Sequence, residues 1–303
     1  MKSLRPIAAL VLLGALALGA LAHAADAPVA LKTTELGHGP TVVFVPGLGG
    51  TRLDWMPTAK RLLATHRVVM VDLPGQGDSP LPDPFSLQVA AEALDGVLAK
   101  QNADSTVVVG AGVGGLLALL AVSAHPGHAR GIVLIDTQVK SPIPVPDQQR
   151  EQLMRFMDDN YQAFSQMAFS RMGRDSAENA RIMTMMAAVP APTVKAYFRH
   201  LIAVDANKDA KALKRPMALV FTDRIWKKGQ SWGTVSKGFG WEDSTVAVPR
   251  RITDAGYLVM KDQPDTLADL VRRFSAASIG ANTGTKTGTN TGANTGANTG
   301  AKK

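Results

Sequence analysis

The chain has 303 residues, a formal net charge of +8 and no cysteine. Without cysteine it has no disulfide, no thiolate metal site and no cysteine nucleophile. The charge excess falls to +3 when five basic residues near the two ends are left out: Lys2, Arg5, Lys286, Lys302 and Lys303. A small excess spread over the chain, with no basic helix, argues against nucleic acid as a partner.

The first 24 residues have the pattern of a secretory signal peptide. Lys2 and Arg5 precede an apolar run over residues 7–21, and small residues follow at 22–24. A transmembrane anchor is the alternative, but the run is short and rich in Ala and Gly. We therefore expect an exported bacterial protein, periplasmic or secreted, with no stable membrane insertion after cleavage.

The other end, residues 279–303, repeats Thr, Gly, Asn and Ala without apolar periodicity. Such a composition cannot offset the entropy of ordering, which predicts a disordered tail. A spacer to the cell wall and a β-prone tract are weaker alternatives. Residues 25–278 are left as the folded part, which is long enough for one large core.

Short β-branched runs alternate with amphipathic stretches, the pattern of βαβ units in a mostly parallel sheet. The predicted strands are residues 41–45, 66–72, 105–110, 131–136, 217–222 and 244–248. The predicted helices are residues 53–64, 87–100, 114–124 and 265–275. The fold class is therefore α/β, with helices on both faces of the sheet.

Residues 141–211 interrupt this alternation, because they carry helical patterns and many methionines but no strand signal. An insertion of this length between strands predicts a helical cap that divides the core into residues 25–140 and 212–278. Methionine suits an adaptable apolar surface, so the cap is expected to cover a pocket at the carboxyl ends of the strands.

Six motifs in order resemble those of the α/β-hydrolase superfamily, in its branch of capped esterases and epoxide hydrolases. They are "VVFVPGLGGTRLDW", "HRVVMVDLPGQGDS", "VVVGAGVGGLLAL", "GIVLIDT", "RPMALVFTDRIW" and "VPRRITDAGYLVMKDQP". The resemblance covers about residues 29–274. It implies the α/β-hydrolase fold, with a mostly parallel central sheet, flanking helices and an inserted cap.

The same resemblance places the catalytic positions on unusual residues. Gly112 occupies the position of the nucleophilic serine, and Tyr257 that of the histidine. The acid falls near Asp223, with Asp136 as the alternative. The family's oxyanion hole would use backbone at Gly47 and Leu48, together with the N–H of Val113.

Loss of both nucleophile and base favours a non-catalytic protein that binds a small apolar ligand or a partner. The alternative is an active, esterase-like hydrolase with non-standard residues, Tyr257, Asp223 or His200 as acid or base. A remote alternative is a dinucleotide-binding protein, because Gly110, Gly112 and Gly115 complete Gly-x-Gly-x-x-Gly after a strand. No histidine or carboxylate pair shows metal-ligand spacing, so neither metal nor cofactor is expected.

Overall fold

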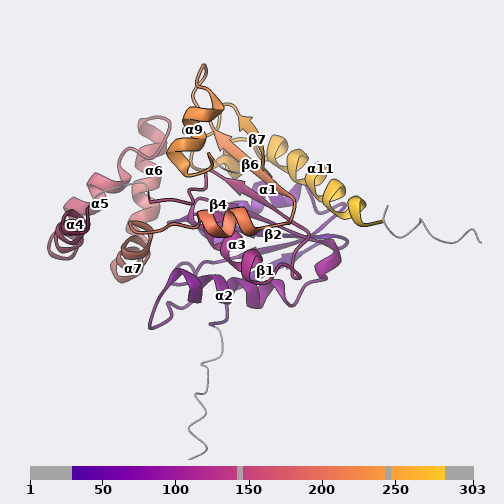
Figure 1. The fold of residues 1–303 in the computed structure, drawn as a ribbon, viewed down its shortest axis with the longest axis horizontal. Coiled ribbons are helices and arrows are strands. Elements are labelled where there is room, and N and C mark those ends of the chain that lie inside the picture. Colours follow the sequence, from indigo (N-terminus) through magenta and orange to yellow (C-terminus); the bar gives the residue numbers. More distant parts are fainter. Residues whose placement is uncertain (1–28, 142–145, 243–246, 284–303) are drawn as a thin grey trace, which may run out of the picture.

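The computed structural model describes residues 29–141, 146–242 and 247–283 (Figure 1). Its centre is a seven-stranded sheet in the order β1-β3-β2-β4-β5-β6-β7. β1 is antiparallel to β3, and the other neighbouring strands are parallel. The strands are β1 Thr33–Leu36, β2 Thr41–Val45, β3 Arg67–Val71, β4 Thr106–Ala111, β5 Gly131–Ile135, β6 Met217–Thr222 and β7 Ala247–Ile252.

Side chains of the central strands alternate between two apolar layers, as the period of two in a strand requires. Val43, Val108 and Leu134 face one layer, whereas Phe44 and Val109 face the other. Because both faces are covered, these strands are continuous apolar runs, which is typical of parallel sheets.

Helices cover both faces of the sheet (Figure 1). α2 (Leu87–Leu98) and α3 (Val113–Ala124) contribute to the first layer. α1 (Met56–Lys60), α10 (Val259–Asp262) and α11 (Pro264–Thr283) lie on the second. No helix among the described residues is long and apolar enough to cross a membrane.

A group of helices between β5 and β6 forms a separate lobe beside the sheet (Figure 1). It comprises α4 Asp147–Asp159, α5 Tyr161–Phe169, α6 Ser176–Ala187 and α7 Ala191–Leu201, whereas the following α8 (Asn207–Ala212) packs on the core beside α3. The lobe has its own apolar cluster around Phe164, Ile182 and Met186, against which Leu48 and Tyr257 of the core also pack. The lobe therefore lies over the end of the sheet where those two residues are found.

The structure differs from the sequence prediction at the sheet edges. β1 was missed because its sequence, TTEL, is short and mixed in polarity. β7 begins at Ala247, and residues 244–246 of the predicted strand lie outside the described residues. Its Pro and Arg residues suit an edge strand. α9 (Trp232–Phe239) was also missed.

The two ends of the chain are only partly described. The predicted signal peptide, residues 1–24, lies outside the described residues, as does the tail beyond residue 283. α11 continues to Thr283, so the prediction of disorder from residue 279 was wrong for the start of that range. Alanine favours helix, which allows α11 to extend into the repeat.

Candidate functional site

The sharp turn between β4 and α3, which we call the elbow, is formed at Gly112. Its backbone has φ +52° and ψ −121°, a conformation that L side chains rarely adopt. The N–H of Gly112 donates to the carbonyl of Ile135 at 2.8 Å. The turn on which a hydrolase of this fold presents its nucleophile is therefore present, without a side chain.

Three glycines of the elbow have different physical roles. A Cβ at Gly114 would meet the carbonyl oxygen of Pro46, and one at Gly115 would meet the hydroxyl of Thr137. A Cβ at Gly112 would have Gly47 Cα as its nearest neighbour, at 3.9 Å. Packing thus requires glycine at 114 and 115, whereas the space at Gly112 admits a side chain.

This difference gives a stability prediction for the elbow. Gly114→Ala is expected to lower the free energy of unfolding by about 3 kcal/mol or more, because the clash is with backbone. Gly96→Ala in α2 is the matched control, since nothing lies within 4 Å of its added Cβ. It should stabilise the fold by roughly 0.5–1 kcal/mol. Urea unfolding of both variants measures the difference, and an equal effect would refute the packing argument.

The loop after β2, residues 46–50, lies beside the elbow. The N–H of Gly50 donates to the carbonyl of Gly47 at 3.1 Å, and that of Gly49 to Gln76 Oε1 at 2.5 Å. Among the described residues no acceptor pairs with the N–H of Leu48 or Val113. These two N–H groups are therefore free to donate to a developing oxyanion.

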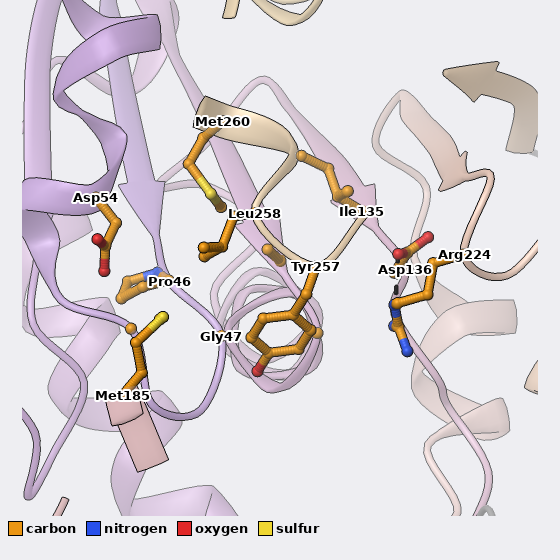
Figure 2. Close-up of a pocket in the computed structure, with 13 residues that line it drawn as sticks. Pro46, Gly47, Asp54, Ile135, Asp136, Met185, Arg224, Tyr257, Leu258 and Met260 are labelled. Carbon is orange, nitrogen blue, oxygen red and sulfur yellow. Dashed lines mark hydrogen bonds and ion pairs between the residues drawn. The ribbon is translucent and has the colours of Figure 1, made fainter. Parts of the chain in front are cut away.

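Tyr257 reaches this loop from the segment after β7, as Figure 2 shows. Its phenol donates to the carbonyl of Leu48 at 2.6 Å. Burial raises the pKa of Tyr257 to about 12, although the nearby Arg224 guanidinium opposes the shift. A phenol with that pKa stays protonated at neutral pH, so Tyr257 is a hydrogen-bond donor and not a base.

Asp136, directly after β5, is the buried carboxylate of the site. It accepts from the N–H and the hydroxyl of Thr222 at 2.8 and 2.7 Å, and from the Arg224 guanidinium at 3.4 Å. Its φ of +45° is unusual for a residue with a side chain. Burial raises the pKa of Asp136, and the interactions with Arg224 and Thr222 oppose that rise. The result is a fixed carboxylate that is more basic than an ordinary aspartate.

The other candidate acids and bases lie away from the site. Asp223 accepts from Arg251 at 2.5 Å and from the N–H of Asp254 at 2.8 Å, so it holds the turn before Tyr257. His200 is bonded to the carbonyl of Phe85 at 3.0 Å. Neither Asp223 nor His200 lines the cavities at the elbow. Of the two candidate acids only Asp136 lines the cavities at the elbow, and no histidine among the described lining residues lies beside it.

Two cavities meet at the elbow. The smaller, of about 20 Å³, is lined by residues that include Gly47, Asp54, Gly112, Asp136 and Tyr257 (Figure 2). The larger, of about 660 Å³, shares Gly112, Asp136 and Tyr257 and extends under the cap. Of the described residues that line either cavity, none is Ser, Thr, Cys or His.

The larger cavity is mainly apolar. Its cap wall comprises Leu153, Phe164, Met167, Ala168, Phe169, Met172, Phe198, Leu201, Ile202 and Val204. Polar groups enter at Gln138, Lys140 and Arg224. This composition suits a flexible apolar chain with a polar group at one end.

The sequence analysis missed two charged residues of the smaller cavity. Asp54 comes from the 3₁₀ turn Arg52–Trp55, where it is paired with Lys261 at 2.5 Å. Arg224 follows Asp223 directly after β6 and lines both cavities. The only sequence signal for Arg224 was its place at the carboxyl end of a strand. A third group, Asp95 with His125 and His128, lies outside this site and was also not anticipated.

A parallel sheet with a strained strand-to-helix elbow, an oxyanion loop beside it and a helical cap above defines a capped hydrolase scaffold. Comparison with known proteins agrees, because residues 40–239 match the family model for the alpha/beta hydrolase fold. The chain belongs to the α/β-hydrolase superfamily.

Among curated proteins, the pimeloyl-acyl-carrier protein methyl ester esterase of Pseudoalteromonas atlantica is 31% identical over 208 residues, 62% of this chain and 76% of that protein. The Neisseria meningitidis protein of the same name is 37% identical over 93 residues, 31% of this chain and 35% of that protein.

Solved structures show the same fold. A thermophilic esterase from Thermogutta terrifontis superposes with a TM-score of 0.66 at 20% identity, covering 82% of this chain and 93% of that one. The enol-lactonase from Burkholderia xenovorans LB400 has a TM-score of 0.65 at 17% identity, covering 82% and 98%.

These comparisons correct the functional prediction made from the sequence. The main prediction, a non-catalytic binder of a small apolar ligand or partner, is contradicted because the relatives are named as esterases and the matching family model is that of the alpha/beta hydrolase fold. The catalytic alternative agrees better with them. The positions at which the family carries serine and histidine are Gly112 and Tyr257 in this chain, so a hydrolase built on this site would have to use other groups.

Proposed function

We propose that the chain hydrolyses carboxylic esters by direct addition of water to the ester carbonyl, with Asp136 as general base. The observation that carries this proposal is the cavity of about 20 Å³ between Gly112 and Asp136. A space of that size holds about one water molecule. Gly112 leaves open the position where related folds place a nucleophilic side chain, so water can approach from there.

The step balances without a covalent enzyme intermediate. Asp136 accepts a proton from the water molecule while the oxygen of that water bonds to the ester carbon. The carbonyl oxygen thereby becomes an oxyanion. The N–H groups of Leu48 and Val113 stabilise that charge. Collapse breaks the bond to the alcohol oxygen, which takes the proton back from Asp136. Ester and water give acid and alcohol.

The expected rate is modest. In serine hydrolases the oxyanion hole and substrate binding alone retain about 10³–10⁴-fold acceleration after a triad residue is removed. A positioned general base contributes typically about 10²–10⁴-fold more. The groups at this site can supply both the oxyanion-hole contribution and the general-base contribution. The full acceleration of an intact triad is not expected.

The larger cavity indicates the substrate class. Its apolar wall under the cap favours a medium-length acyl chain, and the named relatives are methyl ester esterases of a carrier-bound acyl group. Gln138, Lys140 and Arg224 would meet a polar group on that substrate. We propose an acyl ester of a small alcohol as the substrate.

A chain-length series of p-nitrophenyl esters tests this proposal on the full chain. Hydrolysis above the rate without protein is expected, with kcat/KM rising from acetate to medium-chain esters. Ala168→Trp, which narrows the cavity, should reduce hydrolysis of the longer esters selectively. Ala163→Trp, exposed on the same helix, is the control. Absence of hydrolysis with every ester would refute the proposal.

The pH dependence follows from two groups. Hydrolysis needs ionised Asp136, so activity should be lost as pH falls through its pKa, which burial raises above 3.8. Burial raises the pKa of Tyr257 to about 12, so no loss of activity from its ionisation is expected below pH 10. Arg224 and Asp54 are the other charges facing the cavity. Measuring the hydrolysis rate against pH checks both the acidic loss and the absence of an alkaline loss. A rise of activity on acidification would contradict the role of Asp136.

We also propose that the protein is exported to the periplasm or secreted. It rests on Lys2, Arg5 and the apolar run over residues 7–21, which lie outside the described residues. Cell fractionation with mass analysis of the amino terminus tests it, and an uncleaved chain in the cytoplasm would refute it.

A further inference from the structure

A second group of chemically reactive side chains lies far from the elbow. Asp95 of α2, His125 at the end of α3 and His128 in the turn before β5 each offer one atom, and these atoms all lie within 4.8 Å of one another. His128 Nδ1 is 2.7 Å from Asp95 Oδ1, and His125 Nε2 is 3.7 Å from Asp95 Oδ2. The two imidazole rings are stacked, 5.4 Å apart and 10° from parallel.

The charge balance of this group is unusual for a structural ion pair. The Asp95 side chain is only 12% exposed, and within the described chain its ion-pair partners are the two histidines and no lysine or arginine. Buried carboxylates are normally paired with a permanent charge or bound to a metal. Among the described residues Asp95 is paired with groups that are themselves common metal ligands.

The donor set fits a borderline transition-metal ion. Two imidazole nitrogens and one carboxylate oxygen are ligands that Zn²⁺ accepts, at about 2.0–2.2 Å each. Tetrahedral geometry at such lengths separates the ligand atoms by roughly 3.3–3.5 Å. The distances of 2.7 and 3.7 Å lie on either side of that range, so small side-chain rotations would suffice. His125 is 49% exposed, which leaves a path for the ion and a fourth position for water.

The cluster of Asp95, His125 and His128 lies too far from the elbow to take part in ester hydrolysis there. The N–H of Arg130 donates to the carbonyl of Thr106 at 2.7 Å, which places the turn of His128 at the first residue of β4. The elbow follows the last residue of that strand. Six residues of strand span roughly 20 Å, so the two sites lie at opposite edges of the sheet.

We propose that Asp95, His125 and His128 form a Zn²⁺ site that joins the α2 helix to the turn between α3 and β5. Bound metal would tie together two segments that the side-chain pairs of Asp95 with His128 and His125 already bring close, and would stabilise the folded state. The site does not depend on the proposed esterase activity, so failure of one leaves the other standing.

Titration of the tag-free, chelator-treated full chain with ZnCl₂ tests the proposal by calorimetry and thermal unfolding. We expect one saturable Zn²⁺ per chain and a rise in Tm that EDTA reverses. MgCl₂ should do neither, because Mg²⁺ prefers oxygen ligands. Asp95→Asn, His125→Gln and His128→Gln should each weaken Zn²⁺ binding at least about ten-fold. Exposed His38 lies outside the cluster, so His38→Gln should bind as the unaltered chain does.

The His125→Gln variant separates loss of Zn²⁺ binding from a loss of stability that has nothing to do with the metal. Asp95→Asn and His128→Gln also break the 2.7 Å pair and could lower stability without metal. His125 is half-exposed and farther from Asp95, so its replacement should leave the metal-free Tm unchanged while binding is lost. Absence of saturable binding, or binding that survives both histidine substitutions, would overturn the proposal.

Discussion

Asp136→Asn is expected to lower kcat/KM for the preferred ester by at least about 100-fold, the lower end of the usual contribution of a general base. The amide can still accept the Thr222 N–H bond at the same position, so the fold should persist. It cannot take a proton from water at neutral pH. Steady-state kinetics measure the effect, with circular dichroism to confirm the fold.

The matched control is Asp223→Asn, because Asp223 is the other acid position implied by the family resemblance. Its carboxylate pairs with Arg251 and lines neither cavity, so activity should remain within about three-fold. A loss confined to Asp223→Asn would reverse the assignment of the acid. Equal activity of both variants would remove Asp136 from the mechanism.

The second large effect is a change in chemistry. Gly112→Ser combined with Tyr257→His should create a nucleophile that reacts covalently with a fluorophosphonate probe. The added Cβ at Gly112 has no neighbour nearer than 3.9 Å, so the serine fits. Position 257 faces the same small cavity, where Asp136 can orient an imidazole. Intact-mass analysis measures the adduct.

The single variants separate the two contributions. Gly112→Ser alone should be labelled far more slowly than the double variant, because Tyr257 with a pKa of about 12 cannot activate the hydroxyl and Asp136 is then its only base. It should also slow ester hydrolysis, since the side chain occupies the approach of water. Tyr257→His alone should remain unlabelled. Labelling of Gly112→Ser alone as fast as that of the double variant would mean that Asp136 activates the serine without an imidazole.

Strands whose two faces are buried were predicted from the sequence, whereas strands at the sheet edges were predicted poorly. The central strands were found because both of their faces are covered, as in Val42, Val43 and Phe44, and they form uninterrupted apolar runs. β1 and β7 lie at the edges of the sheet, where one side of each strand has no neighbour and polar residues are tolerated. Their positions follow from pairing with β3 and β6, which local sequence does not encode.

Backbone features of the site were more predictable than its charges. Gly112 and the oxyanion loop are marked by glycine spacing, because a strained turn and close packing require particular residues locally. The pairing of Asp136 with Arg224 joins the ends of β5 and β6 and depends on their neighbouring places in the sheet. The choice between Asp136 and Asp223 therefore needed the folded chain.

The histidine cluster shows the same limit. His125 and His128 are close in sequence, but the third group, Asp95, comes from α2. α2 and α3 pack on one face of the sheet, which brings the carboxylate to the histidines. No spacing rule connects residues 95 and 125, so the sequence analysis found no metal-ligand pattern there.

The central claim is ester hydrolysis without a covalent intermediate, and one measurement tests it most directly. The unaltered chain is incubated with excess fluorophosphonate, then examined by intact mass and by turnover of its preferred ester. The mechanism predicts no adduct at the elbow and undiminished hydrolysis, because Gly112 offers no nucleophile and water is the attacking group. A stoichiometric adduct accompanied by loss of turnover would contradict it.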